Sequence, residues 1–386
     1  MGIEVRNLQK HYGDFFMNLS FEVQDGETLV LAGPSGCGKT TALNLIAGLS
    51  KADGGSIAIG GTEIQGLPPW QRTVSMVFQD LALFPHLDVG GNIAYSPFIH
   101  RKSKAERKAI IQETLKIVQL SGFERRRIET LSGGERQRAA IARALAASPK
   151  ALLLDEPFSS LDEPLRAQLR QEFLEIRQRS AIPWIFVTHD RVEAAILGDR
   201  IALMSRGTIL EIGPREALFL APKTEFGASF FGAGEVLPGS IQSGPTRDGT
   251  IPVNTPLGTV AIPVDAAEAA GFPAAAGFSG AAGFSAAAGS SAAADAVDSP
   301  QCRVFIPHDA VSLSQGGGAG IGKITVRGMV KHSLFQGDTI KVTLELPGGF
   351  LFSFETGPRA ALPSPGNGVA IEIQESLLRF VIPQNE

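Results

Sequence analysis

The residues best suited to chemistry form one glycine-rich stretch near the N-terminus, Gly33-Pro34-Ser35-Gly36-Cys37-Gly38-Lys39-Thr40-Thr41. It follows an apolar run at 29–32, typical of a buried strand, and precedes a segment at 42–49 whose apolar positions are typical of a helix. A strand, a glycine loop, Lys-Thr and a helix in this order predict a phosphate-binding loop. The glycines let successive N–H groups point into one concavity, and the helix N-terminus adds partial positive charge. We therefore expect Lys39 to reach the β- and γ-phosphates of a nucleotide and the Thr40 hydroxyl to ligate Mg²⁺.

Two acidic residues, Asp155 and Glu156, follow a second apolar run at 151–154. Phosphate chemistry needs a metal ligand and a group that activates water. An acid at the carboxyl end of a buried strand, beside the phosphate loop, is suited to hold Mg²⁺, so Asp155 is the candidate metal ligand. Glu156 is then the candidate general base, a role that contributes about 10²–10⁴-fold in rate. The alternative is a pair of solvated acids at a strand end.

Three more side chains are candidates for the same site. His189 follows an expected strand at 185–187 and could hydrogen-bond the γ-phosphate and the attacking water. Gln79 closes an expected strand at 74–78, and its amide could ligate the metal or the water. Tyr12 precedes the glycine loop and could stack on a nucleotide base, although a solvent-facing tyrosine is the commoner case.

The elements that must position these residues alternate between strands and helices. This alternation predicts a parallel sheet with helices packed on it. We expect this first domain to end near 235, where glycines and Pro238-Gly239 cluster. The expected strands are 3–5, 19–23, 29–32, 56–59, 74–78, 151–154 and 185–187, and the expected helices are 42–49, 104–120 and 131–147.

From 236 to 386 the composition changes to short apolar runs between Pro and Gly turns, which predicts a small all-β domain. An Ala/Gly insert at about 266–298 interrupts this domain, and Ala-Ala-Gly-Phe recurs within it. A segment of such low complexity is interpreted as a flexible loop. The expected strands are 250–253, 258–262, 303–306, 323–329, 339–346 and 350–354.

The length, charge and cysteine content of the chain restrict the classes of protein to which it can belong. A chain of 386 residues predicts two or three domains. The net charge of −4 gives no excess of basic residues of the kind that binds nucleic acid. The two cysteines, Cys37 and Cys302, exclude a disulfide framework or a zinc pattern and favour a reducing compartment. The first residues lack the basic and apolar regions of a secretory signal, and no run of about 20 strongly apolar residues is present.

Together these motifs resemble the ATP-binding cassette of ABC transporters. The Leu-Ser-Gly-Gly element is specific to that family, and kinases and small GTPases lack it. The resemblance covers about 3–235 and implies an α/β P-loop NTPase cassette with a helical subdomain at about 80–148. The motifs that carry it are 33–41, Leu131-Ser132-Gly133-Gly134-Glu135-Arg136-Gln137-Arg138, Leu152–Pro157, Ser159-Ser160-Leu161-Asp162 and Thr188-His189-Asp190.

The resemblance also implies a head-to-tail homodimer with two ATP molecules between its subunits. Ser132, Gly133, Gly134 and Glu135 form the signature that would cap the γ-phosphate of ATP bound by the other copy, and Asp162 belongs to the neighbouring D-loop. In each site the resemblance implies that Tyr12 stacks on the adenine and that 33–41, with Lys39, binds the phosphates. Thr40, Gln79 and Asp155 would bind Mg²⁺. Glu156 would activate the water, and His189 would sense the γ-phosphate.

The chain departs from the family pattern at three places. Glu135 stands where glutamine is usual, and we expect its charge to point away from the triphosphate. Ser160 replaces a common alanine, and Arg191-Val192 follows the histidine motif where Gln-Glu is frequent. Neither of the last two changes is expected to abolish hydrolysis.

A narrower resemblance concerns importers served by a solute-binding protein. It is carried by 78–87, a segment that in the family contacts the membrane permease, and by the tail, which resembles an OB-like regulatory domain around Arg303–Val311. This implies an ATPase subunit at the cytoplasmic face of the cell (inner) membrane, partnered by permease subunits and indirectly by a solute-binding protein.

The residues Phe84–Leu87 and Asn92–Tyr95 most resemble those of ferric-iron cassettes, and this resemblance implies ferric iron as the solute, with polyamine, thiamine and sugar importers as alternatives. Two different functions are also compatible with a cassette: a non-transport ABC ATPase, and a module that no longer hydrolyses ATP. The single cassette argues against translation factors, the absence of a long heptad repeat argues against repair ATPases, and the intact catalytic residues argue against a module without hydrolysis.

Overall fold

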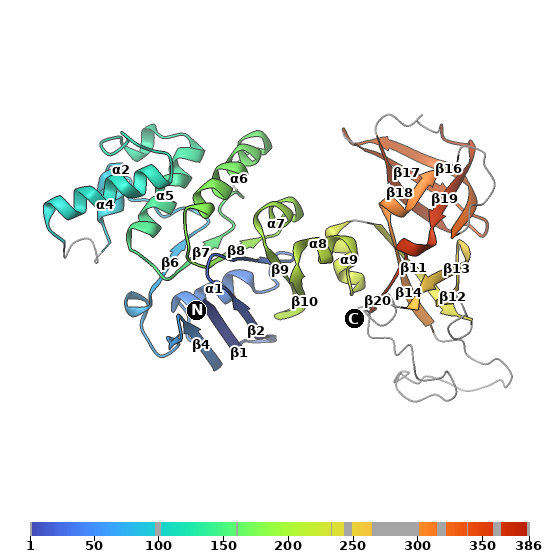
Figure 1. Ribbon diagram of the computed structural model, residues 1–386, viewed down its shortest axis with the longest axis horizontal. Coiled ribbons are helices and arrows are strands. Elements are labelled where there is room, and N and C mark those ends of the chain that lie inside the picture. The colour runs from blue at the N-terminus through green and yellow to red at the C-terminus, as the bar shows by residue number, and fades with distance from the viewer. Residues whose placement is uncertain are drawn as a thin grey trace. The chain divides into compact units, whose positions relative to one another are not determined.

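A computed structural model describes residues 2–96, 102–159, 161–232, 234–242, 249–264, 301–314, 322–337, 339–357 and 364–383. The chain divides into two units, Met1–Glu216 and Ala217–Glu386 (Figure 1). The sequence places this boundary near 235. Packing places it earlier because α9 (Glu225–Phe231) contributes Ala228 to an apolar cluster with Phe305 and Val381 of the second unit. The predicted insert at 266–298 and Ser160 lie outside the described residues.

The central sheet of the first unit has the strand order β10-β9-β3-β8-β7-β6. The strands from β9 to β6 run parallel, and β10 adds an antiparallel edge. Strands β3, β7 and β8 are buried along their whole length, which explains their continuous apolar runs. The carboxyl ends of β3, β6, β7 and β8 therefore meet at one edge. The bounds are β3 (Thr28–Ala32), β6 (Val74–Val77), β7 (Ala151–Asp155), β8 (Trp184–Thr188), β9 (Arg200–Ser205) and β10 (Thr208–Pro214).

A second, antiparallel sheet of this unit has the order β2-β1-β4-β5. Its apolar side chains share one core with α1 (Lys39–Ala47) and with the central sheet, so α1 is held between the two sheets. This packing fixes the start of α1, where the glycine loop ends. The bounds are β1 (Ile3–Tyr12), β2 (Phe15–Val23), β4 (Gly54–Ile59) and β5 (Thr62–Glu63), so β1 is longer than the predicted strand at 3–5.

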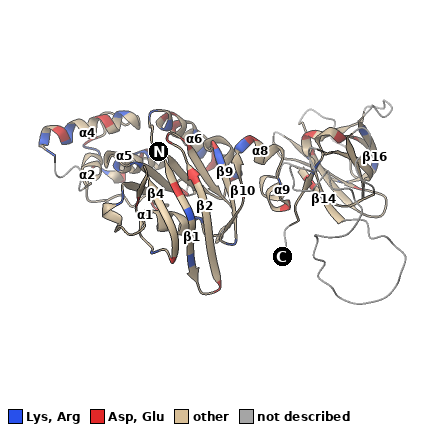
Figure 2. Cartoon of the chain, turned by 60° about the horizontal axis from the view of Figure 1, so that its bottom comes forward, with Lys and Arg blue, Asp and Glu red and all other residues tan. Residues whose placement is uncertain are grey.

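Helices α2 (Val89–Ala94), α4 (Lys104–Ile117) and α5 (Gly133–Ala146) pack on one another and form the helical part of this unit (Figure 1). Capping boxes open both α4 and α5, which places their first residues at Lys104 and Gly133. Lys and Arg are interspersed with Glu along α4 (Figure 2). The short 3₁₀ turns are η1 (Pro69–Gln71) and η2 (Ile128–Thr130).

Helix α6 (Glu163–Gln178) was not predicted from the sequence. It begins after Asp162, whose side chain caps its N-terminus, and buries Leu169, Phe173 and Ile176. Helix α7 (Arg191–Leu197) follows β8 and is capped by Asp190. In the described part of the chain, no helix has the length and apolar character needed to cross a membrane.

The second unit is mostly β, as predicted, and begins within α8 (Arg215–Leu220). In its described residues, one antiparallel sheet has the order β13-β12-β11-β14-β20 and another has the order β15-β19-β16-β17-β18, and both contribute to one apolar core. The bounds are β11 (Gly234–Ile241), β12 (Thr250–Thr255), β13 (Gly258–Pro263), β14 (Gln301–Pro307), β15 (Val311–Leu313), β16 (Lys323–Phe335), β17 (Ile340–Glu345), β18 (Leu351–Thr356), β19 (Gly368–Gln374) and β20 (Arg379–Val381). The 3₁₀ turns here are η3 (His308–Ala310) and η4 (Glu375–Leu377).

Candidate active site

The glycine loop joins the end of β3 to the start of α1. A side chain at Gly33 would place its Cβ 2.3 Å from the Met204 carbonyl oxygen, and one at Gly38 would lie 2.9 Å from the Phe15 ring. Both glycines also have positive φ angles, which other residues rarely adopt. The loop can therefore close onto the sheet only with glycine at these positions, and its curvature leaves the first N–H groups of α1 available to an anion.

The remaining loop residues surround this turn. Pro34, Ser35 and Gly36 are exposed, and Thr41 lies in the first turn of α1. Cys37 is buried, and this burial raises the pKa of its thiol. The side chain therefore stays an uncharged thiol at neutral pH.

Lys39 is 5% exposed, and its ammonium group lies over the loop. Nζ donates to the carbonyl oxygens of Gly33 at 2.8 Å and Pro34 at 2.9 Å. It also lies 3.9 Å from Oε1 of Glu156. A buried cation held mainly by neutral carbonyls can exchange these partners for phosphate oxygens.

Thr40 and Asp155 meet at the mouth of the loop. The Thr40 hydroxyl donates to Oδ1 of Asp155 at 3.0 Å, and burial raises the pKa of this carboxyl group. Mg²⁺ prefers oxygen ligands and usually binds with substrate phosphates and waters, so this pair fits the ion. Among the described residues, no cluster of three or more His, Cys, Asp and Glu side chains could hold a metal.

Glu156 has the side-chain contacts expected of a positioned base. Its Oε2 lies 2.9 Å from Nδ1 of His189. Its φ of 41° is left-handed, a conformation that costs a residue other than glycine about 1–3 kcal/mol. The backbone N–H donates to the Val187 carbonyl at 3.1 Å, so pairing with the end of β8 helps to maintain this strained turn.

Gln79 and Tyr12 lie at the margins of the site. Gln79 donates to the Ser159 hydroxyl at 3.1 Å, and that hydroxyl donates to the Glu156 carbonyl at 3.0 Å. Gln79 is thus linked to the segment after β7. Tyr12 ends β1 with half of its surface exposed, and its hydroxyl lies 2.8 Å from the hydroxyl of Ser50. Its ring is anchored at the hydroxyl end, and Nζ of Lys10 lies 5.0 Å from the ring centroid.

The signature residues open α5. The Ser132 hydroxyl accepts from the Glu135 N–H at 3.2 Å, while Oε2 of Glu135 accepts from the Ser132 N–H at 2.7 Å. That backbone hydrogen bond is the main cause that lowers the pKa of Glu135. Glu135 is therefore engaged by its own helix. The Ser-x-x-Glu spacing is itself a capping-box signal, from which this contact could have been predicted but was not.

The two signature glycines allow α5 to pack closely. A Cβ at Gly133 would lie 3.0 Å from a methyl carbon of Leu161, and one at Gly134 would lie 3.0 Å from a methyl carbon of Leu169. These distances are tighter than ordinary Cβ contacts. The glycines therefore bring the signature against the segment that contains Asp162 and against α6.

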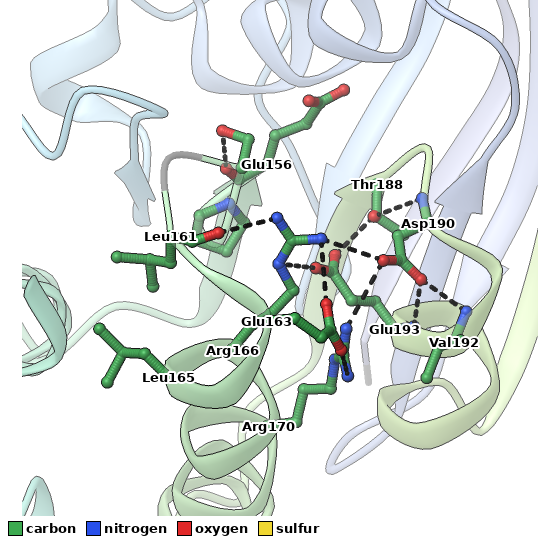
Figure 3. A network of polar contacts seen from close by, with 12 residues as sticks. Glu156, Leu161, Glu163, Leu165, Arg166, Arg170, Thr188, Asp190, Val192 and Glu193 are labelled. Carbon is green, nitrogen blue, oxygen red and sulfur yellow. Dashed lines mark hydrogen bonds and ion pairs between the residues drawn. The ribbon is translucent and has the colours of Figure 1, made fainter. Parts of the chain in front are cut away.

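A network of charged side chains surrounds Asp190 and was not predicted from the sequence (Figure 3). It includes Arg166 and Arg170 of α6 and Glu193 of α7. The i, i+4 spacing of the two arginines indicates that they share a helix face. Glu163 of α6 pairs with both arginines as well, at 3.7 Å from Arg166 and 3.0 Å from Arg170. Asp190 and Glu193 come from the segment after β8, so only the fold reveals their part of the network.

Comparison with known proteins identifies two family matches along the chain. Residues 16–159 match the ABC transporter family, and residues 309–380 match the TOBE domain. The spermidine/putrescine import ATP-binding protein PotA of Clostridioides difficile is 45% identical over 239 residues, which cover 61% of this chain and 69% of that protein. The Fe(3+) ions import ATP-binding protein FbpC of Photorhabdus laumondii is 42% identical over 241 residues, covering 62% and 69%.

A solved structure has a similar fold. The cbiO1 protein of Clostridium perfringens, described as part of the ABC transporter complex cbiONQ, superposes with a TM-score of 0.52 at 24% identity. The match covers 56% of this chain and 90% of that chain. From the family matches and the identity to the curated relatives, the chain belongs to the ATP-binding subunits of ABC transporters, which are ATPases, and carries a TOBE domain after its cassette.

Proposed function

We propose that this chain hydrolyses ATP at the loop of residues 33–41 and thereby powers solute import through a separate permease. The observation that carries the proposal is the meeting of Lys39, Thr40, Asp155, Glu156 and His189 at one edge of the central sheet. A cation, a metal-binding pair, a carboxylate base and an imidazole are the groups that phosphoryl transfer to water requires.

Each residue of the site has its own role in ATP binding and hydrolysis. Lys39 and the N–H groups of the loop hold the β- and γ-phosphates. Thr40 and Asp155, with Gln79 nearby, would hold Mg²⁺, which when bound neutralises charge on the phosphates. Glu156 accepts a proton from the attacking water, and His189 orients that water and the γ-phosphate. Tyr12 stacks on the adenine.

The site is completed by a second copy of the chain in this proposal. Ser132 and Gly134 present a helix N-terminus, which suits an anion such as a γ-phosphate. ATP would then lie between the loop of one copy and the signature of the other, with Asp162 at the interface. Because the site forms only on closure, ATP binding and hydrolysis alternate with opening and closing of the homodimer.

Ser132→Arg is expected to block this closure while leaving ATP binding intact, because a long cation would occupy the place of the partner's γ-phosphate. Size-exclusion chromatography with ATP, in the Glu156→Gln background, measures the dimer. The matched control is Ser103→Arg, since Ser103 opens α4 with the same capping box but lies outside the site. An ATP-induced dimer of normal stability in the Ser132 variant would contradict the trans role.

Coupling to a permease would act through the segment that follows Gln79. Arg143 of α5 donates to the Leu81 carbonyl at 2.9 Å. The Asn92 side chain accepts from the Phe84 N–H at 2.8 Å, and the Phe84 and Tyr95 rings lie 4.2 Å apart. A partner that pushes on this segment would thus move Gln79. We propose that the subunit works peripherally at the cytoplasmic face of the membrane.

For the solute we propose ferric iron, on the strength of residues 84–87 and 92–95 and the 42% identity to FbpC. Polyamine is the second candidate, because PotA proteins are among the similar relatives. Deleting the gene for this chain in its host and measuring uptake of labelled ferric iron and labelled spermidine tests both. Loss of iron uptake alone supports the first, loss of spermidine uptake alone supports the second, and loss of neither rejects both.

A further inference from the structure

Asp190 follows His189 directly, and its carboxylate joins two helices (Figure 3). Oδ1 accepts from the N–H groups of Val192 at 2.7 Å and Glu193 at 3.1 Å, which caps α7. Oδ2 accepts from Nη1 of Arg166 at 3.3 Å. The backbone next to the histidine is therefore held both by its own helix and by α6.

The other terminal nitrogen of Arg166 contacts the segment just before its own helix. Nη2 donates to the Leu161 carbonyl at 3.0 Å, one residue before Asp162. One guanidinium thus connects the segment 161–162 to Asp190. Arginine presents its donors in a rigid planar fork that spans both acceptors, whereas lysine is a compact charge on a flexible stem and would not hold them in the same geometry.

The surroundings of Arg166 make these contacts firmer than those of a surface ion pair. Glu193 is 3% exposed and Arg170 is 4% exposed. Nε of Arg166 lies 3.9 Å from Glu193, and Nη2 of Arg170 lies 3.5 Å from Asp190. Exposed pairs contribute about 0–1 kcal/mol, whereas removing one member of a buried pair is strongly destabilising. The network therefore favours one arrangement of its members.

His189 depends on this arrangement for its position. Its side chain is 51% exposed, and its ring contacts Glu156. The Thr188 hydroxyl accepts from the Asp190 N–H at 2.9 Å and donates to Glu193 at 2.5 Å, so the residues on both sides of the histidine belong to the network. A shift of Asp190 would move the imidazole relative to the carboxylate.

We propose that Arg166 is a positioning residue that couples the loop at Leu161–Asp162 to His189. The loop that contains Asp162 lies at the proposed dimer interface, so its placement by the second copy is transmitted to the imidazole that faces Glu156. The inference rests on the proposed function, because that function assigns roles to His189 and Glu156. It adds a reason why hydrolysis would follow closure.

Arg166→Lys in the full-length chain tests the coupling. We expect kcat for ATP to fall by about tenfold, since small misplacements of catalytic groups have effects of this order or larger. KM and the equilibrium affinity for ATP should change by less than about twofold, because Arg166 does not contact the glycine loop in the structure. A purely structural role would instead lower the melting temperature and the folded fraction, so that the apparent kcat and the number of ATP sites per chain would fall together.

The matched control is Arg177→Lys. Arg177 lies on the same helix, pairs with Asp199 and donates to the Gly26 carbonyl at 3.1 Å, and its side chain is 23% exposed against 21% for Arg166. It has the same kind of contacts without touching either loop. Its kcat should remain within about twofold of the wild-type value.

A double-mutant cycle tests whether Arg166 acts on His189 through Asp190. Asp190→Asn keeps an oxygen for the α7 cap but removes the charge that Arg166 holds, so it should lower kcat by a similar factor. Combining it with Arg166→Lys should lower kcat by less than about a further twofold.

Folded Arg166→Lys protein with wild-type kcat would overturn the coupling. Fully multiplicative losses of kcat in the double variant would overturn it as well. If the Arg166→Lys protein does not fold, the kcat of Asp190→Asn tests the coupling by itself, and a wild-type kcat in that variant would contradict it. Wild-type turnover in Glu156→Gln would reject the proposed function instead, whatever Arg166→Lys does.

Discussion

Glu156→Gln is expected to lower ATP turnover by about 10²–10⁴-fold, the contribution of a positioned general base. The amide has the size of the carboxylate but cannot take the proton of the attacking water. Its contact with His189, at 2.9 Å in the wild-type chain, can be kept as a hydrogen bond. The geometry should therefore survive while the chemistry is lost. Phosphate release at saturating ATP and Mg²⁺ measures the effect.

The same substitution should stabilise the ATP-bound dimer. It removes a negative charge that lies 3.9 Å from Lys39 and close to the place proposed for the triphosphate, so repulsion falls while hydrolysis no longer reopens the dimer. Size-exclusion chromatography with and without ATP detects this species. Glu172→Gln is the control, since Glu172 is 15% exposed against 18% for Glu156 and pairs with Arg138 of α5 rather than with Lys39 or His189. Unchanged turnover would remove Glu156 as the base.

Lys39→Ala is expected to abolish measurable turnover and to weaken ATP binding. Hydrogen bonds to charged groups contribute about 1.5–3 kcal/mol each. Losing two of them to phosphates corresponds to a fall in affinity of at least about hundredfold. The loss also leaves Glu156 without its nearby cation and two carbonyls of the loop without their donor. Titration with a fluorescent ATP analogue measures the affinity.

Lys150→Ala serves as the control for this loss of a lysine, because Lys150 is exposed and lies outside the site. Melting curves of both variants separate loss of the fold from loss of the phosphate contacts. A Lys39→Ala protein that melts normally and binds ATP with near-normal affinity would show that the ammonium is not the phosphate ligand.

Local sequence determined the parts of this protein that depend on short-range chain geometry. The run 29–41 specifies strand, loop and helix because its three glycines occupy backbone conformations that other residues avoid. Apolar runs before Asp155 and His189 specified buried parallel strands. Parallel strands bring their carboxyl ends to one edge, so the meeting of the loop with Asp155, Glu156 and His189 followed from the strand pattern.

Tertiary structure decided what depends on partners from other elements. The first unit ends at Glu216 in the structure and not near 235, because α9 packs on strands that come later in the chain. Helix α6 was not predicted, because its buried face packs on β8 of the sheet, on α5 and on α7. The link from Arg166 to Asp190 and Leu161 requires one guanidinium to meet both a carboxylate 24 residues away and the carbonyl just before the N-cap of its own helix. Side-chain hydrogen bonds have a range of about 3 Å, so only the packed fold determines which of them form.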